Sequence, residues 1–354
     1  MAYISFKPTD HFNPKKYTGD GSTSHSITGV GFQPDLVWNK PRDTSGWHRV
    51  FDSVRGVLNV IYPNDTYNNE VMPSPGGLNA FNSDGFTLGD NTGSNENTKL
   101  FITWNWKMGT TSGLSGGTIT PASYSINTTA KQGVYKWAGT GSNGTIAHGL
   151  GSTPKMFIVK QLNSTAGWQV YHSALGETKV FYLNSDAAPD TSSTVWNDTA
   201  PTSTLLSLGT NTGTNASGSD YIGYAFCDVK GYCKIGSYKG NATADLKGPF
   251  IYTGFRPAFI MIKILVGTAS WYLYDNTRQG YNGDEGATPY LQANATSVDD
   301  TNAGNFGLDI YNTGFKVRGS HTGVSGNNDE LSYIAFAEFP MVSSTGQATP
   351  GALF

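Results

Sequence analysis

Charged residues are scarce in this sequence. Asp, Glu, Lys and Arg make up 14% of its 354 residues, and the formal net charge is −3. The 23 Lys and Arg residues are scattered along the chain and do not form the basic stripe that a DNA- or RNA-binding surface requires. We therefore expect no nucleic-acid partner.

Long apolar runs are also absent. No stretch of the sequence approaches the roughly 20 apolar residues needed to cross a bilayer. The opening residues, MAYISFKPTDHF, lack the basic and apolar regions of a secretory signal peptide. The sequence therefore predicts neither membrane insertion nor a signal-directed secretion route.

Cysteine is rare, and metal-binding patterns are correspondingly weak. Cys227 and Cys233 are separated by five residues, which does not match common zinc spacings. Free thiols are the favoured interpretation, and a small disulfide loop is the alternative. We expect no cofactor, although the Asn/Asp-rich turn at 297–305 offers the oxygen ligands that Ca²⁺ prefers.

Helical periodicity is missing too. No long stretch carries apolar residues at the i, i+3, i+4, i+7 spacing of an amphipathic helix. Instead the chain has 44 glycines, 13% aromatic residues and many Asn, Thr and Ser residues. This composition is typical of short strands joined by tight turns, so the sequence predicts an all-β fold.

One ten-residue phrase occurs three times, as GFQPDLVWNK (31–40), GSTPKMFIVK (151–160) and GFRPAFIMIK (254–263). Each copy has a proline six residues before a lysine, and a tryptophan seven or eight residues after that lysine. These markers are Pro34, Lys40 and Trp47, then Pro154, Lys160 and Trp168, then Pro257, Lys263 and Trp271. We expect the proline to start a strand, the apolar run to fill a core and the tryptophan to pack against it. A sugar-stacking role for the tryptophans is the alternative.

Two copies also share an Asp-x-x-Arg pattern. Asp52 is followed by Arg55, and Asp275 is followed by Arg278, whereas the second copy has His172 at the corresponding place and no arginine. Each Asp–Arg couple is interpreted as an ion pair or a turn-stabilising hydrogen bond near a strand end.

The spacing of the copies predicts three tandem antiparallel β-sandwich domains, lectin-like or jelly-roll-like in type. The predicted boundaries are an N-terminal arm (1–16), repeat 1 (17–110), a Gly/Ser/Thr-rich linker (111–133), repeat 2 (134–231), repeat 3 (232–340) and a C-terminal arm (341–354). The connection between repeats 2 and 3 is short, so we expect these two to pack together.

Catalytic motifs are matched only superficially. GTGSNG (139–144) fits a dinucleotide-binding pattern and GLSGG (113–117) fits a nucleophile elbow, but neither has the strand-to-helix context that the chemistry requires. A glycosidase needs two facing carboxylates, and no pair stands out among Asp35, Asp52, Glu70 and Asp84. We therefore assign no catalytic residue and expect a protein that is not an enzyme.

Several longer phrases resemble a known group of proteins. YTGDGSTSHSITGVGFQPDLVWNK, FDSVRG, FNSDGFTLG and, near the end, NTGFKVRG and YIAFAEFPMVSSTG are similar to a repeated domain of uncharacterised virion proteins. These proteins occur in phages of aquatic bacteria, including cyanophages and pelagiphages. The resemblance implies a lectin-like sandwich of concanavalin or SPRY type and a tail-fibre or other structural role. The second copy departs from the pattern at 172–176 and lacks the SDGF phrase, which implies loss of any ligand site there.

We therefore expect a non-enzymatic structural protein located on the virion, made in the host cytoplasm and exposed on the particle as a capsid decoration, a cement protein or a fibre component. We expect a homotrimer that binds other virion proteins through its terminal arms, with a host-surface glycan as a further partner. The alternatives are a host-receptor or glycan-binding fibre protein and a polysaccharide-degrading tail enzyme.

Overall fold

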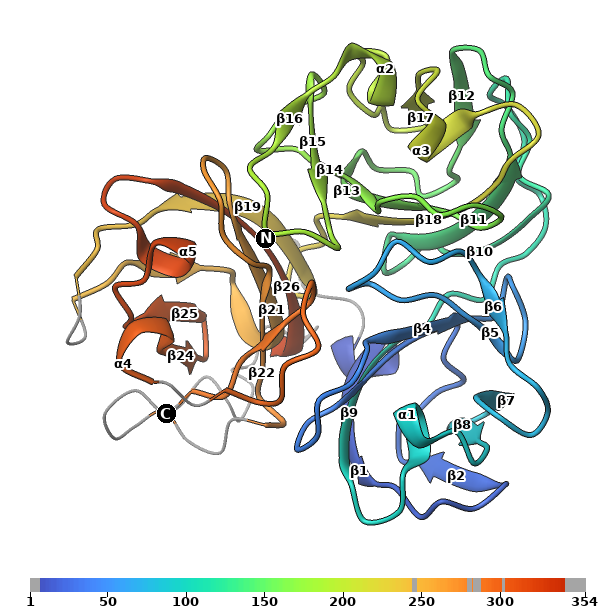
Figure 1. Ribbon diagram of the computed structural model, residues 1–354. Helices are drawn as coiled ribbons and strands as arrows, with labels where there is room; N and C mark the ends of the chain where they lie inside the picture. The colour runs from blue at the N-terminus through green and yellow to red at the C-terminus, as the bar shows by residue number, and fades with distance from the viewer. Residues whose placement is uncertain (1–6, 244–246, 279–281, 283–287, 301–302, 341–354) are drawn as a thin grey trace.

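The computed structural model describes residues 7–243, 247–278, 282, 288–300 and 303–340 (Figure 1). Its regular structure consists almost entirely of antiparallel strands, and each α-helix of the described part is a single turn of four residues. The all-β prediction is confirmed. The chain is treated below as unit 1 (7–110), unit 2 (111–231) and unit 3 (232–340).

Unit 1 packs a larger sheet against a smaller one. Its elements are η1 (Pro8–Asp10), β1 (Phe12–Thr18), β2 (His25–Thr28), β3 (Leu36–Pro41), β4 (Arg49–Asp52), β5 (Asn59–Val60), β6 (Glu70–Val71), β7 (Leu78–Asn82), β8 (Gly85–Leu88), α1 (Thr92–Asn95) and β9 (Leu100–Trp106). The larger sheet has the order β1-β9-β3-β4 and the smaller one β2-β8-β7, while β5 pairs with β6. Val37, Phe51 and Phe86 are among the buried residues of its core.

Unit 2 has the same plan with extra strands. Its elements are β10 (Ser123–Asn127), β11 (Gln132–Ala138), β12 (Gly144–Ala147), β13 (Pro154–Gln161), β14 (Gln169–His172), β15 (Lys179–Tyr182), β16 (Asp190–Thr191), α2 (Ser193–Trp196), β17 (Leu205–Leu208), α3 (Thr212–Asn215) and β18 (Asp220–Cys227). The seven-stranded sheet runs β10-β11-β18-β13-β14-β15-β16, and β12 pairs with β17.

Unit 3 repeats the plan once more. Its elements are β19 (Cys233–Lys239), β20 (Phe250–Tyr252), β21 (Phe255–Ile264), β22 (Tyr272–Asp275), β23 (Leu291–Gln292), α4 (Ala303–Phe306), β24 (Leu308–Tyr311), β25 (Gly314–Val317), α5 (Thr322–Ser325) and β26 (Glu330–Pro340). The sheets have the orders β19-β26-β21-β22-β23 and β20-β25-β24. The same strand order therefore occurs three times along the chain.

The ten-residue phrase that occurs three times forms β3, β13 and β21. Each of these strands pairs with the last strand of its unit. β3 is buried along its whole length, as are nearly all residues of β13 and β21. One face of each strand contributes to the core of its own unit, and the other contributes to a core shared by all three units. A strand buried on both faces reads as a continuous apolar run rather than an alternating one.

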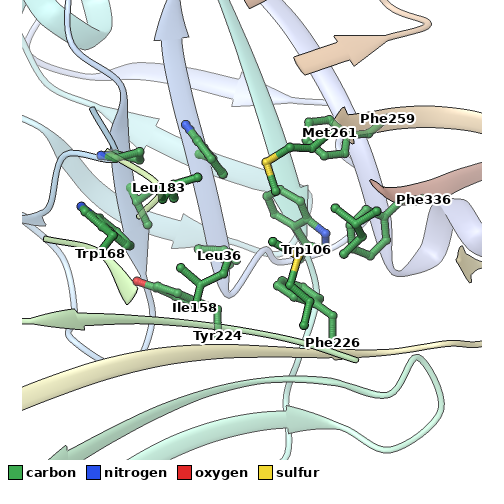
Figure 2. Close-up of a pocket in the computed structure, with 15 residues that line it drawn as sticks. Leu36, Trp106, Ile158, Trp168, Leu183, Tyr224, Phe226, Phe259, Met261 and Phe336 are labelled. Carbon is green, nitrogen blue, oxygen red and sulfur yellow. The ribbon is translucent and has the colours of Figure 1, made fainter. Parts of the chain in front are cut away.

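The shared core lies where the three larger sheets meet, at the centre of the three lobes in Figure 1. Trp106, Phe226 and Phe336 come from equivalent positions of β9, β18 and β26, judged by their strand pairing. Their ring centroids form a triangle with sides of 6.2, 5.6 and 5.5 Å. Figure 2 shows these rings meeting beside Leu36, Ile158 and Met261, so each unit supplies part of one apolar centre.

Two predicted boundaries need correction. Residues 12–16, assigned to an N-terminal arm, belong to β1, because Phe12 is fully buried against Phe259 and Phe336 of unit 3. The predicted linker, 111–133, contains β10 and the first residues of β11. The C-terminal arm, 341–354, lies outside the described residues, as do residues 1–6.

Candidate functional site

The three marker lysines are buried and join one unit to another. Each Nζ donates to a backbone carbonyl of the last residue of its own strand or of the following loop, and to one or two carbonyls of a neighbouring unit. Lys40 of unit 1 reaches Thr296 O (3.3 Å) and Ser297 O (2.7 Å) of unit 3. Lys160 of unit 2 reaches Thr66 O (3.2 Å) of unit 1. Lys263 of unit 3 reaches Asp186 O and Ala187 O (both 3.0 Å) of unit 2.

These bonds close a ring: unit 1 binds unit 3, unit 3 binds unit 2, and unit 2 binds unit 1. The acceptors lie in the same loop each time, at 62–69, 183–189 and 293–299. Burial lowers the pKa of Lys40 to about 7 and the pKa values of Lys160 and Lys263 to about 8. Removal of the ammonium from water favours its neutral form. The marker lysines are thus positioned to hold the units together.

In two units the marker tryptophan also bonds to a neighbouring unit, in the same cyclic order as the lysines. Trp168 donates its indole N–H to Tyr62 O of unit 1, and Trp271 donates to Tyr182 O of unit 2, both at 2.9 Å. Both indoles are buried, in agreement with the packing interpretation.

In unit 1 the equivalent residue is His48, not Trp47. The backbone N–H groups of His48, Trp168 and Trp271 all donate to an asparagine side chain, Asn64, Asn184 and Asn294 respectively. The His48 Nε2 lies 3.0 Å from Gln292 O of unit 3, while its Nδ1 accepts from Trp38. The predicted alignment was wrong by one residue here: the equivalent position just before β4 is held by His48, which is fully buried.

Trp47 therefore packs at the edge of the core of unit 1 and is only partly buried. Its ring centroid is 4.8 Å from that of Tyr62 and 5.5 Å from that of Tyr67. Tyr67 is 53% exposed. The Tyr62 hydroxyl donates to the Glu70 carboxylate, so the aromatic group has a polar edge. We call Trp47, Tyr62 and Tyr67 the aromatic platform.

Three surface hollows adjoin the aromatic platform. The first, of about 360 Å³, is lined by the platform with Asn68, Asn69 and Glu70. The second, of about 300 Å³, shares Trp47 and adds Thr44, Ser45, Arg49 and Glu96. The third, of about 350 Å³, shares Asn68 and Asn69 and reaches Lys136, Asn163 and Asp220 of unit 2. The first hollow shares residues with each of the other two, and the third lies at the border of units 1 and 2.

Each Asp–Arg couple is a buried ion pair at a border between units. Nε of Arg55 donates to Asp52 Oδ2 at 2.6 Å, and Nε of Arg278 donates to Asp275 Oδ2 at 2.6 Å. The same aspartate oxygens accept from a neighbouring unit. Tyr224 OH of unit 2 reaches Asp52 at 2.8 Å, and the Trp104 indole of unit 1 reaches Asp275 at 3.1 Å.

His172 fills the third place in this pattern. Its Nε2 lies 3.3 Å from Tyr333 O of unit 3, and its Nδ1 accepts from the Ala174 N–H at 3.1 Å. Burial lowers the pKa of His172 to about 4, so the ring is neutral at pH 7. The bonding pattern requires this tautomer, with the proton on Nε2. The second unit has thus replaced an ion pair by a neutral bridge.

The sequence analysis missed a capping turn that recurs in every unit. The residues are Asn91, Asn211 and His321, whose side chains each accept from the glycine N–H two residues later and so begin α1, α3 and α5. The phrases NTGSN, NTGTN and HTGVS carried this signal, because a short polar side chain followed by Thr-Gly is typical of such a turn.

The described residues are poorly suited to binding a metal ion. They contain no group of three or more His, Cys, Asp or Glu residues placed to hold an ion. In the proposed calcium turn, the Asp299 carboxylate accepts from Arg42 and Arg278 at 2.8 Å each, and Asp300 accepts from Tyr290 OH. Cys227 and Cys233 are free and buried, as expected, and burial raises the pKa of Cys227 to about 12.

A comparison with protein families gives a match that covers residues 7–340. The chain belongs to the family of the domain of unknown function DUF7483. No curated protein and no solved structure matches the chain significantly.

The DUF7483 match begins before β1 and ends with β26. It therefore includes all three units and the ring of lysine contacts between them. In the part of the chain that the structure describes, no helix is long and apolar enough to cross a membrane.

Proposed function

We propose that this DUF7483 protein is a non-enzymatic structural protein of a phage particle, exposed on the virion surface as a capsid decoration, a cement protein or a fibre component. The sequence resemblance to virion proteins of aquatic-bacteria phages suggests this setting. The observation that carries the structural role is the lysine ring, which joins the three lobes of a single chain into one body.

The chemistry of the repeated residues supports a role without catalysis. Lys40, Lys160 and Lys263 are held by backbone carbonyls, and the Asp52 and Asp275 carboxylates are held by arginine side chains. Side chains that are buried and fully engaged in bonding are poorly placed to bind or transform a substrate. Their polar groups maintain the contacts between units instead.

The arrangement of the units also suits a symmetric particle. A chain with three similar lobes around one centre presents three similar surfaces, as a trimer of small subunits does. We propose that it occupies a site of threefold character on the virion. The homotrimer and the binding of other virion proteins through the terminal arms stay predictions.

Cryo-electron microscopy of purified phage particles tests this proposal. We expect a three-lobed density with buried Trp168 and Trp271 side chains on the outer surface of the capsid or tail. Recovery of the protein only from infected-cell lysate, and never from purified particles, would contradict it. So would depolymerisation of host polysaccharide by the purified chain.

A further inference from the structure

The aromatic platform is present in one unit only. The backbone N–H groups of Gly46, Ala166 and Ala269 donate to the carbonyls of Thr296, Thr66 and Asp186. These bonds align the three segments residue by residue. The position of Trp47 in unit 1 is then occupied by Gly167 in unit 2 and Ser270 in unit 3.

The second exposed ring is equally asymmetric. Asn64, Asn184 and Asn294 are equivalent, since each accepts from the N–H described above. Three residues further along, Tyr67 of unit 1 corresponds to Ala187 of unit 2 and Ser297 of unit 3. The residues that form the ring of contacts have equivalents in all three units, whereas Trp47 and Tyr67 do not. The fold itself therefore does not require them.

Tyr67 is exposed and Trp47 is partly exposed at the same concave surface. Exposed aromatic side chains cost free energy when they stay in water, and a concave surface with a few polar groups is the usual form of a ligand site. Asn68 is exposed beside Tyr67, and Asn69 lies at the junction of two hollows. An indole and a phenol ring offer flat apolar faces, and the asparagine amides offer both donors and acceptors.

Charges of both signs line the three hollows. Arg49 donates to Gly93 O at 2.7 Å, the Glu70 carboxylate accepts from Tyr62, and the ammonium of Lys136 lies 3.9 Å from the carboxylate of Asp220. No single sign of charge dominates the described lining. This balance favours an uncharged ligand that has both apolar faces and hydroxyl groups.

We propose that the aromatic platform and its adjoining hollows bind a neutral oligosaccharide, and that unit 1 alone carries this site. The C–H face of one sugar ring stacks on Trp47 and Tyr67, and its hydroxyls bond to the amide of the exposed Asn68, while the Asn69 amide stays bonded to Arg55 and Asn59. Neighbouring sugars extend into the hollows on either side. The inference goes beyond the structural role proposed above and does not depend on where the protein sits in the virion.

Calorimetry and a glycan array with short neutral oligomers of glucose, galactose, mannose and N-acetylglucosamine test the proposal on the full chain. We expect one site per chain for at least one of these oligomers. The variants Trp47→Ala and Tyr67→Ala should each weaken binding at least tenfold, because a stacking ring is the type of residue that dominates such sites. Their thermal unfolding should stay close to that of the unaltered protein.

Two further variants make the assignment specific. Tyr252→Ala removes a 60%-exposed tyrosine of unit 3 and should leave binding unchanged. The double variant Gly167→Trp with Ala187→Tyr places both rings in unit 2, where Tyr182 already corresponds to Tyr62. A Cβ at Gly167 would lie 3.4 Å from Asn184 Oδ1, an ordinary contact. We expect this variant to bind with two sites per chain.

The proposal is overturned if no neutral oligomer binds, or if uronic-acid oligomers bind and neutral ones do not. It is also overturned if Tyr252→Ala weakens binding as much as Trp47→Ala does. Loss of a protein partner by Trp47→Ala, without any sugar binding, would assign the platform to a protein contact instead. Each of these results leaves the virion proposal intact, since that one is decided by imaging of the particle.

Discussion

The Nζ of Lys160 lies 3.2 Å from the carbonyl oxygen of Thr66, which is 94 residues away and in another unit. Lys40 and Lys263 make the same kind of contact with the two remaining units. Each of these lysines, which the sequence pattern places at the end of a core strand, therefore connects two units. Four experiments test the energetic consequences of this ring.

The first prediction concerns Lys160 and alkaline pH. Its pKa is about 8 in the folded protein against a reference value of 10.5, so the unfolded chain binds more protons between these pH values. The free energy of unfolding should therefore rise with pH in this range. Lys160→Met removes this contribution. Urea denaturation at pH 8 and pH 10 should show a gain about 2 kcal/mol smaller for the variant than for the unaltered protein. Equal gains in both proteins would contradict the assigned burial of the ammonium.

The second prediction concerns His172 and acid. Its folded-state pKa of about 4 lies below the reference value of 6.5, so its contribution to stability is complete above pH 6.5 and is lost as the pH falls towards 4. Protonation also destroys the acceptor that Nδ1 offers to the Ala174 N–H. The loss should reach about 3 kcal/mol.

His172→Gln is the matched variant, since glutamine does not titrate in this range. Denaturation curves at pH 7 and pH 4.5 should differ less for the variant than for the unaltered protein. An identical acid sensitivity would mean that other groups, and not His172, determine it.

The third prediction concerns the buried ion pair in unit 3. Asp275→Asn removes the carboxylate from the fully buried Arg278 side chain and weakens the bond from the Trp104 indole. The buried guanidinium keeps Asp299 as its remaining ionic partner, so we expect the variant to lose about 3 kcal/mol, the lower end of the cost of breaking a buried pair. Arg256→Met, which breaks the partly exposed pair with Glu338, is the control and should cost less than about 1 kcal/mol. Comparable losses in both variants would show that burial does not distinguish the two pairs.

The fourth prediction concerns the aromatic triangle. Trp106 Nε1 is buried without a hydrogen-bond partner beside an apolar cavity of about 30 Å³. Trp106→Phe makes the triangle uniform and removes the unpaired N–H, whose cost of about 1–3 kcal/mol offsets the lost packing. We expect a change in unfolding free energy of less than about 1 kcal/mol. Phe336→Ala, in contrast, should cost about 3–5 kcal/mol, and calorimetric unfolding checks both.

The sequence by itself determined the all-β class and the local elements. Turn residues, aromatic composition and the missing helical period all act within a few residues, so they can be read along the chain. The recurrence of proline, apolar run and lysine likewise marked the central strands β3, β13 and β21. The Asp-x-x-Arg spacing marked the two ion pairs, because three residues separate partners that meet at one strand end.

Only the tertiary structure decided which partners these residues meet. The three lysines, the Trp168 and Trp271 indoles and the two aspartates each bond to a different unit, over separations that no local pattern encodes. The same holds for the one-residue shift just before β4 that buries His48 fully and leaves Trp47 only partly buried. The register of the backbone hydrogen bonds fixes which of the two side chains is buried between the units. It thereby also fixes which residues hold the units together and which are free to bind a ligand.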